Sequence, residues 1–149
     1  MALLEKELFV QPSTLEGAGD GLFTRIDIKK GTRIIEYKGK VTTWKEVTST
    51  GIFNGYVFYI KKNHVIDAKN YKKGIARFAN DARGLTRKKG TVNNAEYVQE
   101  AGRVFIEAKK NIAAGEEIFV SYGKEYWDVV RNNNRIDAME AKKKQKKNA

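Results

Sequence analysis

Glycine and proline usage divides this chain into short segments. Thirteen glycines and a single proline, Pro12, are spread over 149 residues. Glycine interrupts regular structure and supplies positive φ in turns. The runs between the glycines are rich in β-branched and aromatic residues, which favour strands. The sequence therefore predicts a mainly β domain of short strands, over residues 7–11, 33–37, 56–60, 64–68, 95–99, 103–108 and 117–122.

The spacing of these runs adds detail to this prediction. Residues 56–68 and 95–108 each read as a hairpin, because two β-rich runs flank a short polar or glycine-containing turn. Residues 42–50 read as a loop or short helix. From Lys124 to about Ala141 the apolar residues take a helical spacing. We predict one domain over residues 1–130, followed at 131–149 by a helical extension and a basic, disordered tail.

The absence of cysteine excludes several classes of protein. Without cysteine the chain has no disulfide, no thiolate zinc site and no cysteine nucleophile. The single histidine, His64, cannot form a histidine-rich metal site, and we assign it to the structure of the strand that it begins. Metal sites built on thiolates or on several histidines are therefore not expected, and the activity considered below needs no metal. Hydrophobic residues make up 41% of the chain, enough for one core.

Charge points to acidic partners. The chain carries a net charge of +11, and residues 131–149 alone hold seven lysines and arginines against two acids. Such a balance attracts nucleic acid without sequence choice. No apolar run is long enough to span a membrane, and the N-terminus does not read as a secretory signal. We therefore expect an intracellular protein without membrane contact, cytoplasmic in a bacterium and nuclear in a eukaryote or virus.

Three clusters carry residues suited to chemistry, although each alone has an ordinary explanation. The glycines of residues 17–21 (GAGDG) fit a turn with positive φ, or a backbone that approaches a cofactor; the spacing is not that of a dinucleotide-binding loop. Residues 76–82 (ARFANDA) fit a side-chain-capped turn, or a polar wall for a ligand. Residues 115–123 (GEEIFVSYG), followed by Tyr126 and Trp127, fit an aromatic core, or a narrow apolar channel.

The order of these clusters resembles the SET domain of protein lysine methyltransferases. The similarity runs from about Gly17 to Trp127 and includes the glycine motif, the ARF-x-N segment and the segment from GEE to YG. The compact length and the YGKEYW ending look most like small stand-alone SET proteins of viruses and bacteria. This resemblance implies a β-clip-like fold of small sheets around a pseudoknot, with a C-terminal helix.

The resemblance also implies an activity and its residues. It implies S-adenosylmethionine as methyl donor, S-adenosylhomocysteine as product, and a lysine ε-amine of a protein as acceptor. Tyr122 matches the catalytic tyrosine, while Tyr56 and Tyr126 match walls of the channel for the substrate lysine. The positions that match cofactor-binding residues are Gly17, Ala18, Gly19, Arg77, Phe78, Asn80, Asp81, Tyr122 and Trp127.

Two alternatives stay open at this point. Asp81 stands where the family usually has histidine, which is the sequence reason for considering an inactive SET scaffold. The lysine runs and many tyrosines also fit a basic nucleic-acid-binding module. For the enzyme, a histone or histone-like DNA-associated protein is one candidate substrate, with the basic tail in non-specific contact with nucleic acid. The oligomeric state is open, a homodimer included.

Overall fold

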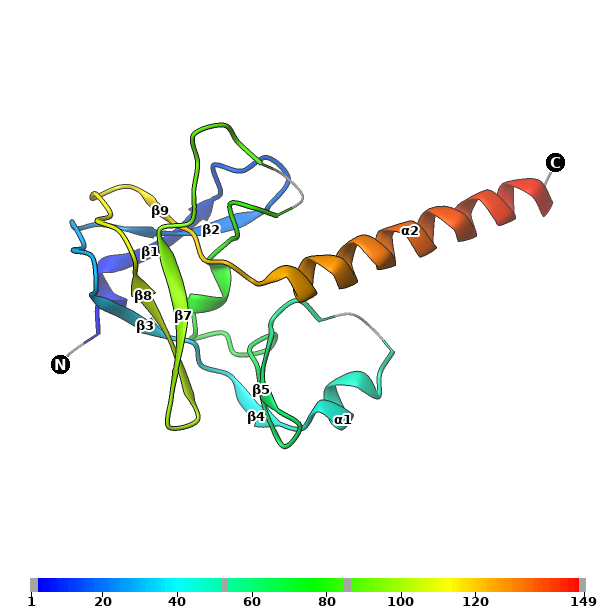
Figure 1. Cartoon of the computed structure of the whole chain (residues 1–149), viewed down its shortest axis with the longest axis horizontal. Helices are drawn as coiled ribbons and strands as arrows, with labels where there is room; N and C mark the ends of the chain where they lie inside the picture. The colour runs from blue at the N-terminus through cyan, green and yellow to red at the C-terminus, as the bar shows by residue number, and fades with distance from the viewer. Residues whose placement is uncertain (1–2, 52–53, 85–86, 148–149) are drawn as a thin grey trace.

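Three small antiparallel sheets make up the body of the molecule (Figure 1). The computed structural model describes residues 3–51, 54–84 and 87–147. In spatial order, the sheets are β1 (Leu8–Pro12), β2 (Asp20–Thr24) and β9 (Glu117–Ile118); β3 (Arg33–Glu36), β8 (Arg103–Ala108) and β7 (Ala95–Glu100); β4 (Lys40–Thr42), β6 (His64–Asp67) and β5 (Val57–Lys61). The helices are the 3-10 turns η1 (Glu5–Glu7) and η2 (Ala76–Phe78), the short α1 (Trp44–Thr48) and the long α2 (Lys124–Lys147). The predicted class of small sheets with a C-terminal helix is confirmed.

Both predicted hairpins are present. In the β5–β6 hairpin Lys61 pairs with His64, so two residues form the turn. In the β7–β8 hairpin Glu100 pairs with Arg103, and the turn residues Ala101 and Gly102 both have positive φ, 51° and 79°. Two successive positive φ values match the twist of the flanking strands. The hairpin therefore holds a non-glycine residue in the left-handed region, where a side chain is disfavoured.

Strands β2 and β4 were not predicted. Strand β2 begins in the glycine motif, which reads as a flexible stretch because glycine weakens strands. The structure gives the reason for Gly21: a Cβ there would overlap the side chain of Glu117. The close approach of a neighbouring carboxylate, rather than flexibility, requires glycine at this position.

The core lies between the first two sheets. Its fully buried centre comes from β2, β3, β7, β8 and the segment around β9, and consists of Leu22, Ile34, Ala95, Val104, Ile106, Ile118 and Val120. At about 25 cal/mol per Å² of buried apolar surface, side chains of this kind supply most of the driving force for folding. The third sheet contributes Ile66 of β6 to the same cluster.

A crossing of distant segments joins the sheets. Beyond β9 the chain pairs on two sides, with Phe119 bridged to Asn80 and Val120 bridged to Ala95, both in parallel. The Val120 N–H donates to the Asn80 carbonyl at 2.9 Å, and the Ala95 N–H donates to the Phe119 carbonyl at 2.9 Å. The run predicted as one strand over 117–122 is therefore a two-residue strand followed by this double pairing.

Helix α2 projects away from the body (Figure 1). It begins at Lys124 as predicted but continues to Lys147, beyond the predicted end near Ala141. Lysine, glutamine and alanine are good helix formers, and lysine is favourable near a helix C-terminus, so the lysine-rich sequence extends the helix. The division at residues 130 and 131 stays a prediction. Within the described residues, no helix combines the length and the hydropathy that crossing a membrane requires.

We expect Ala101→Asn to stabilise the protein. Asparagine tolerates the left-handed conformation that Ala101 adopts, so the free energy of unfolding should rise by about 1 kcal/mol. Urea denaturation would measure the change. Ala113→Asn is the control, because Ala113 is also exposed but has no positive φ, and it should have little effect. A destabilised Ala101→Asn protein would contradict the strain inferred at this turn.

Candidate active site

Four segments that are distant in sequence surround one hollow of about 520 Å³ beside the crossing. This volume lies in the usual range of small-molecule sites. Every site residue predicted from the sequence lines it: Gly17, Ala18, Gly19, Tyr56, Arg77, Phe78, Asn80, Asp81, Tyr122, Tyr126 and Trp127. The structure thus collects residues from the glycine loop, from the residues before β5, from η2 and its continuation, and from Tyr122 and the start of α2. Their individual roles stay predictions.

The glycine loop forms one wall of the hollow. Gly17 and Gly19 have φ of 76° and 72°, and a Cβ built at either would meet no neighbouring atom within 4 Å. Positive φ, not crowding, therefore requires glycine at these two positions. The N–H of Ser13 donates to the Gly19 carbonyl at 2.8 Å, which closes the base of the loop. The loop therefore needs positive φ, and it also lines the hollow; its approach to a cofactor stays a prediction.

Glu117 anchors the residues that lead into the glycine loop. This carboxylate is 4% exposed. It accepts hydrogen bonds from the Ser13 hydroxyl at 2.7 Å, and from the Thr14 backbone N–H and hydroxyl at 2.8 and 2.7 Å. Without these donors a buried charge would be costly. The role of Glu117 was not predicted, although its place directly after Glu116 in the GEE motif was a usable signal.

Asn80 ties the crossing to the same loop. Its side-chain amide donates to the Asp20 carbonyl at 2.9 Å and to Glu117 at 3.3 Å. The backbone carbonyl of Asn80 accepts the hydrogen bond from the Val120 N–H. Asn80 therefore links the glycine loop to the segment that leads to Tyr122, and the position of each depends on the other.

The aromatic side of the hollow centres on Tyr122. Its ring stacks on Trp127 at 5.7 Å between centroids and meets Tyr126 edge-on at 4.8 Å. The Tyr122 hydroxyl donates to the Ala79 carbonyl. Burial, reinforced by the neighbouring Tyr126 and Asp81, raises the pKa of Tyr122 far above its ordinary value of 10. The hydroxyl therefore stays protonated over the whole working range of pH.

Asp81 joins the aromatic side to η2. Its carboxylate accepts the Trp127 indole N–H at 2.8 Å and the Tyr122 backbone N–H at 2.9 Å. Burial alone would raise the pKa of Asp81, but the hydrogen bonds from Trp127, Tyr122, Asn93 and Arg83 outweigh it and lower the pKa. The residue that departs from the family pattern is thus an ionised, well-bonded part of the site.

Arg77 is the cation of the hollow. Its guanidinium lies 4.7 Å from the Phe78 ring centroid and 5.3 Å from that of Tyr56. One nitrogen donates to the Lys69 carbonyl at 3.0 Å, while the buried Nε has no hydrogen-bond partner within residues 3–51, 54–84 and 87–147. A buried donor without a partner is a place where an anionic group of a ligand can bind.

Sequence reasoning missed some lining residues. Leu15, Asp20, Gly55 and Gly84 also face the hollow. Gly84 lies so close to the Trp127 ring that a Cβ would overlap it, a tertiary contact for which the sequence holds no signal. His64, assigned to structure, begins β6 and packs beside Gly102 of the β7–β8 turn. Among the residues that the structure describes, no cluster of three or more acidic or histidine side chains could hold a metal ion.

Comparison with known proteins finds the same family throughout. A family model of the SET domain matches residues 19–123. The chain is 32% identical over 123 residues to "Histone-lysine N-methyltransferase ASHH1" of Arabidopsis thaliana, covering 75% of this chain and 23% of that protein. It is 24% identical over 130 residues to "N-lysine methyltransferase KMT5A" of Xenopus tropicalis, covering 79% and 37%. The chain thus spans well under half of the length of either relative.

A solved structure shares the fold. The methyltransferase domain of human PR domain-containing protein 2 superposes with a TM-score of 0.59 and 25% sequence identity. The match covers 78% of this chain and 77% of that one. The likeness therefore extends over the body of the molecule and not over a single motif.

We expect Glu117→Ala to destabilise the protein strongly. The substitution leaves the donors of Ser13 and Thr14 without their acceptor and removes one of the two acceptors of the Asn80 amide, so the free energy of unfolding should fall by about 3 kcal/mol. Urea denaturation would measure it. Glu116→Ala is the matched control at the neighbouring, exposed glutamate and should change stability by less than about 0.5 kcal/mol. Equal effects of the two substitutions would refute the anchoring role of Glu117.

Proposed function

The chain belongs to the SET-domain family, and on this premise we propose that it is an S-adenosylmethionine-dependent protein lysine N-methyltransferase. One observation carries the proposal: the glycine loop, the Asn80 segment and Tyr122, far apart in sequence, line one hollow. The proposed product is S-adenosylhomocysteine, and no metal takes part.

The lining residues suit this cofactor. Among the described residues, the buried Nε of Arg77 has no hydrogen-bond partner. It fits the carboxylate at the amino-acid end of S-adenosylmethionine. Backbone at Gly17, Ala18 and Gly19 gives polar groups without side-chain bulk, and the Trp127 face suits a purine. When bound, S-adenosylmethionine supplies a methyl group on a sulfonium, which a neutral amine accepts by in-line displacement.

The chain's own part is to make the lysine amine neutral and to align it. A free lysine has a pKa of about 10.4 and is mostly charged. Aromatic walls from Tyr56 and Tyr126 disfavour the charged form and exclude water from around the amine. The carboxylates that line the hollow are Asp20, which is exposed, and Asp81, whose oxygens are fully bonded. We therefore infer that the amine loses its proton to bulk water as it enters the hollow, and not to a side-chain base inside it.

Tyr122 is the proposed catalytic residue. The Tyr122 hydroxyl donates its proton to the Ala79 carbonyl in a hydrogen bond. The lone pairs of its oxygen are therefore free to stabilise positive charge near the reacting methyl. Its high pKa rules out a tyrosinate. Cation–π attraction from Tyr56 and Tyr126, about 0.5–2 kcal/mol each, would offset part of the cost of burying the methylated ammonium that forms.

The proposed substrate is a protein with an accessible lysine, with histones or histone-like proteins as the first candidates. Support comes from the Arabidopsis thaliana relative, which is named as a histone-lysine N-methyltransferase. A second candidate function is non-specific contact with nucleic acid. The bridge between Ile28 and Ile112 brings two turns together, and these turns carry the exposed lysines Lys29, Lys30, Lys109 and Lys110.

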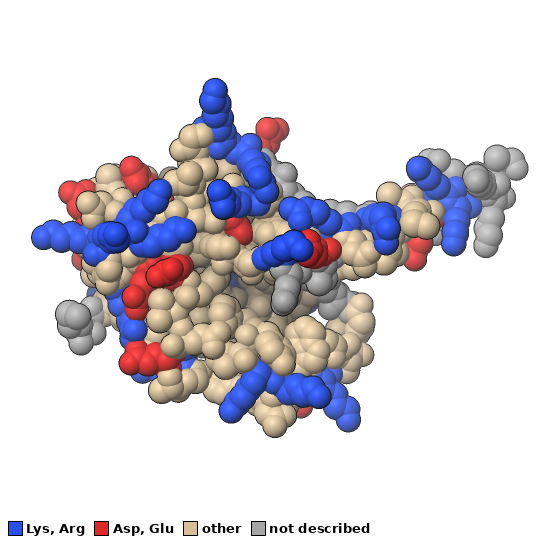
Figure 2. All heavy atoms as spheres, in the orientation of Figure 1, with Lys and Arg blue, Asp and Glu red and all other residues tan. Residues whose placement is uncertain are grey.

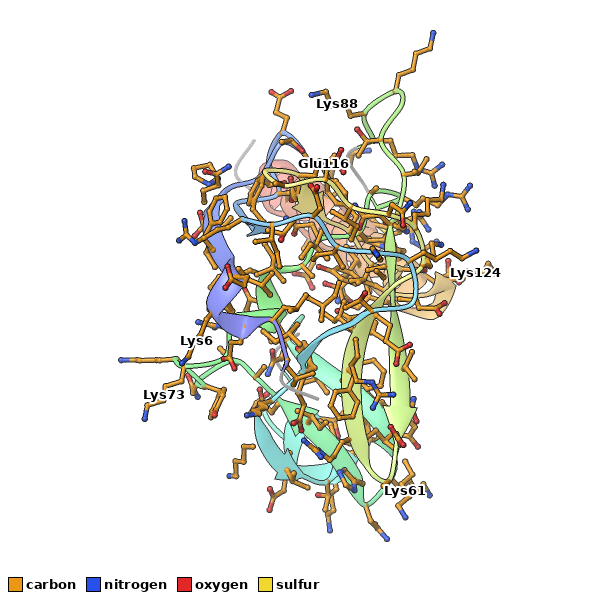
Figure 3. The ribbon with its side chains drawn as sticks, turned by 90° about the vertical axis from the view of Figure 1, so that its left-hand side faces the viewer. Lys6, Lys61, Lys73, Lys88, Glu116 and Lys124 are labelled. Carbon is orange, nitrogen blue, oxygen red and sulfur yellow. The ribbon has the colours of Figure 1, made fainter. Side chains whose placement is uncertain are left out.

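Positive charge is also spread over the rest of the surface. Figure 2 shows lysine and arginine side chains projecting from the body and along α2. In Figure 3 the labelled Lys6, Lys61, Lys73, Lys88 and Lys124 point outward in different directions. This distribution fits non-specific attraction to phosphates better than a single binding groove. It leaves the methyl-transfer site unaffected, so the two functions are compatible.

The first test is calorimetric titration with S-adenosylhomocysteine. We expect one-to-one binding to the full chain, weakened about tenfold in Asn80→Ala, because that variant releases the glycine loop from the crossing. An unchanged melting temperature and no heat on titration of the folded parent would contradict the proposed cofactor site. Salt-dependent binding of duplex DNA in that case would favour the second candidate.

The second test distinguishes a catalytic role of Tyr122 from a role in folding. Tyr122→Phe removes one hydroxyl from the site and should lower the rate of methyl transfer to core histones about a hundredfold, with the affinity for S-adenosylhomocysteine unchanged. Tyr59→Phe is the matched control, because Tyr59 is exposed on β5 outside the hollow. If both variants keep the parent rate, Tyr122 has no part in the chemistry.

A further inference from the structure

The start of helix α2 is the only part of that helix which lines the hollow, among the residues described. Tyr126 and Trp127 belong to its first turn and face the hollow, while the helix then leaves the body (Figure 1). Ile136 and Met139, farther along, are 42% and 53% exposed. One wall of the hollow is thus the first turn of a projecting helix. Contacts with the body of the domain must fix the position of this turn.

The Asp81 carboxylate makes the necessary contacts. It is 5% exposed and accepts four N–H groups, two on each oxygen. One oxygen binds the Arg83 backbone N–H at 2.8 Å and the Asn93 amide at 3.0 Å. The other binds the Tyr122 backbone N–H at 2.9 Å and the Trp127 indole at 2.8 Å. Both oxygens are therefore saturated, and all four donors would lose a partner if the carboxylate were removed.

Only a carboxylate satisfies this set of donors. A neutral imidazole has one acceptor nitrogen, and an amide has one oxygen and would turn its own NH₂ toward two of the donors. The ring of Trp127 is fixed on further sides by stacking on Tyr122, at an interplanar angle of 14°, and by the close approach of Gly84. The indole thus has one orientation, set by one charged acceptor and two packing surfaces.

From this geometry we propose that Asp81 is a positioning residue, which fixes the Trp127 indole and the Tyr122 backbone so that the first turn of α2 forms a wall of the hollow. Asp81 does this through Trp127 and Tyr122 rather than by touching the reacting atoms. The inference rests on the proposed function only where it concerns cofactor affinity. The fixing of α2 follows from the hydrogen bonds alone.

NMR of the full ¹⁵N-labelled chain gives a readout that does not need the cofactor. The chain has two tryptophans, and Trp44 is 44% exposed and outside the hollow, so the Trp44→Phe protein reports Trp127 alone. Its indole N–H should exchange slowly with solvent. In this background Asp81→Asn should shift the indole resonance and accelerate its exchange. An unchanged resonance with unchanged exchange in a folded Asp81→Asn protein would overturn the proposal.

Trp127→Phe tests the same contact from the other side. It keeps an aromatic ring but removes the indole donor, and leaves Asp81 with three donors, so it should fold even if Asp81→Asn does not. We expect faster amide exchange over residues 122–130, and affinity for S-adenosylhomocysteine about tenfold lower than in the parent and in the control Trp44→Phe. Parent-like exchange in Trp127→Phe would also overturn the proposal.

The combination of variants separates this proposal from the proposed function. Asp81→Asn combined with Trp127→Phe should lose less affinity for the product than the sum of the two single losses, because both substitutions break the hydrogen bond between Asp81 and Trp127. Additive losses would show that the two residues act independently and would overturn the positioning role. If the parent binds no S-adenosylhomocysteine, the proposed function fails, while the indole resonance still decides the role of Asp81.

Discussion

The double pairing of residues 119 and 120 is the constraint on which the site depends. One side of this segment bonds to Asn80 and the other to Asn94 and Ala95, while the Asn94 side chain bonds it again at Glu117 and Phe119. These contacts join parts of the chain that are far apart in sequence, so they form only when the whole domain folds. The hollow is a consequence, because Tyr122 can face the glycine loop only if the segment before it is held between η2 and β7.

Two buried carboxylates then fix the two ends of this crossing. Glu117 holds the glycine loop, and Asp81 holds the start of α2. Both are surrounded by N–H and O–H donors, whereas the ion pairs found among the described residues lie elsewhere, on the β3–β8 sheet and on α2. Hydrogen bonds to a charged acceptor are directional and roughly twice as strong as neutral ones. They suit a site in which loops, not long strands, must keep their positions.

The sequence predicts the parts of this molecule whose cause is local. Pairs of β-rich runs around a short polar or glycine-containing turn predict the hairpins of β5–β6 and β7–β8. The ordered motifs predict site residues that all line the hollow. Strand β2 is not predicted, because Gly21 is required by the close approach of Glu117, a residue distant in sequence. The hydrogen bonds of Asp81 could not be predicted for the same reason, since the crossing alone brings Asn93, Tyr122 and Trp127 to its carboxylate. The chain's resemblance to a family locates such residues but does not say what they bind.

The charge distribution bears on how a substrate reaches the hollow. The chain carries +11, yet the lining of the hollow includes one cation, Arg77, and two acids, Asp20 and Asp81. The channel proposed for the lysine is lined by the aromatic Tyr56 and Tyr126, while the outer field repels a free cationic peptide over roughly 10 Å at 0.1 M salt. A lysine on a protein that is bound to nucleic acid avoids this repulsion, because the phosphates attract the same surface. Under the proposed function, the basic surface and the neutralising channel therefore select together for a lysine presented in an acidic setting.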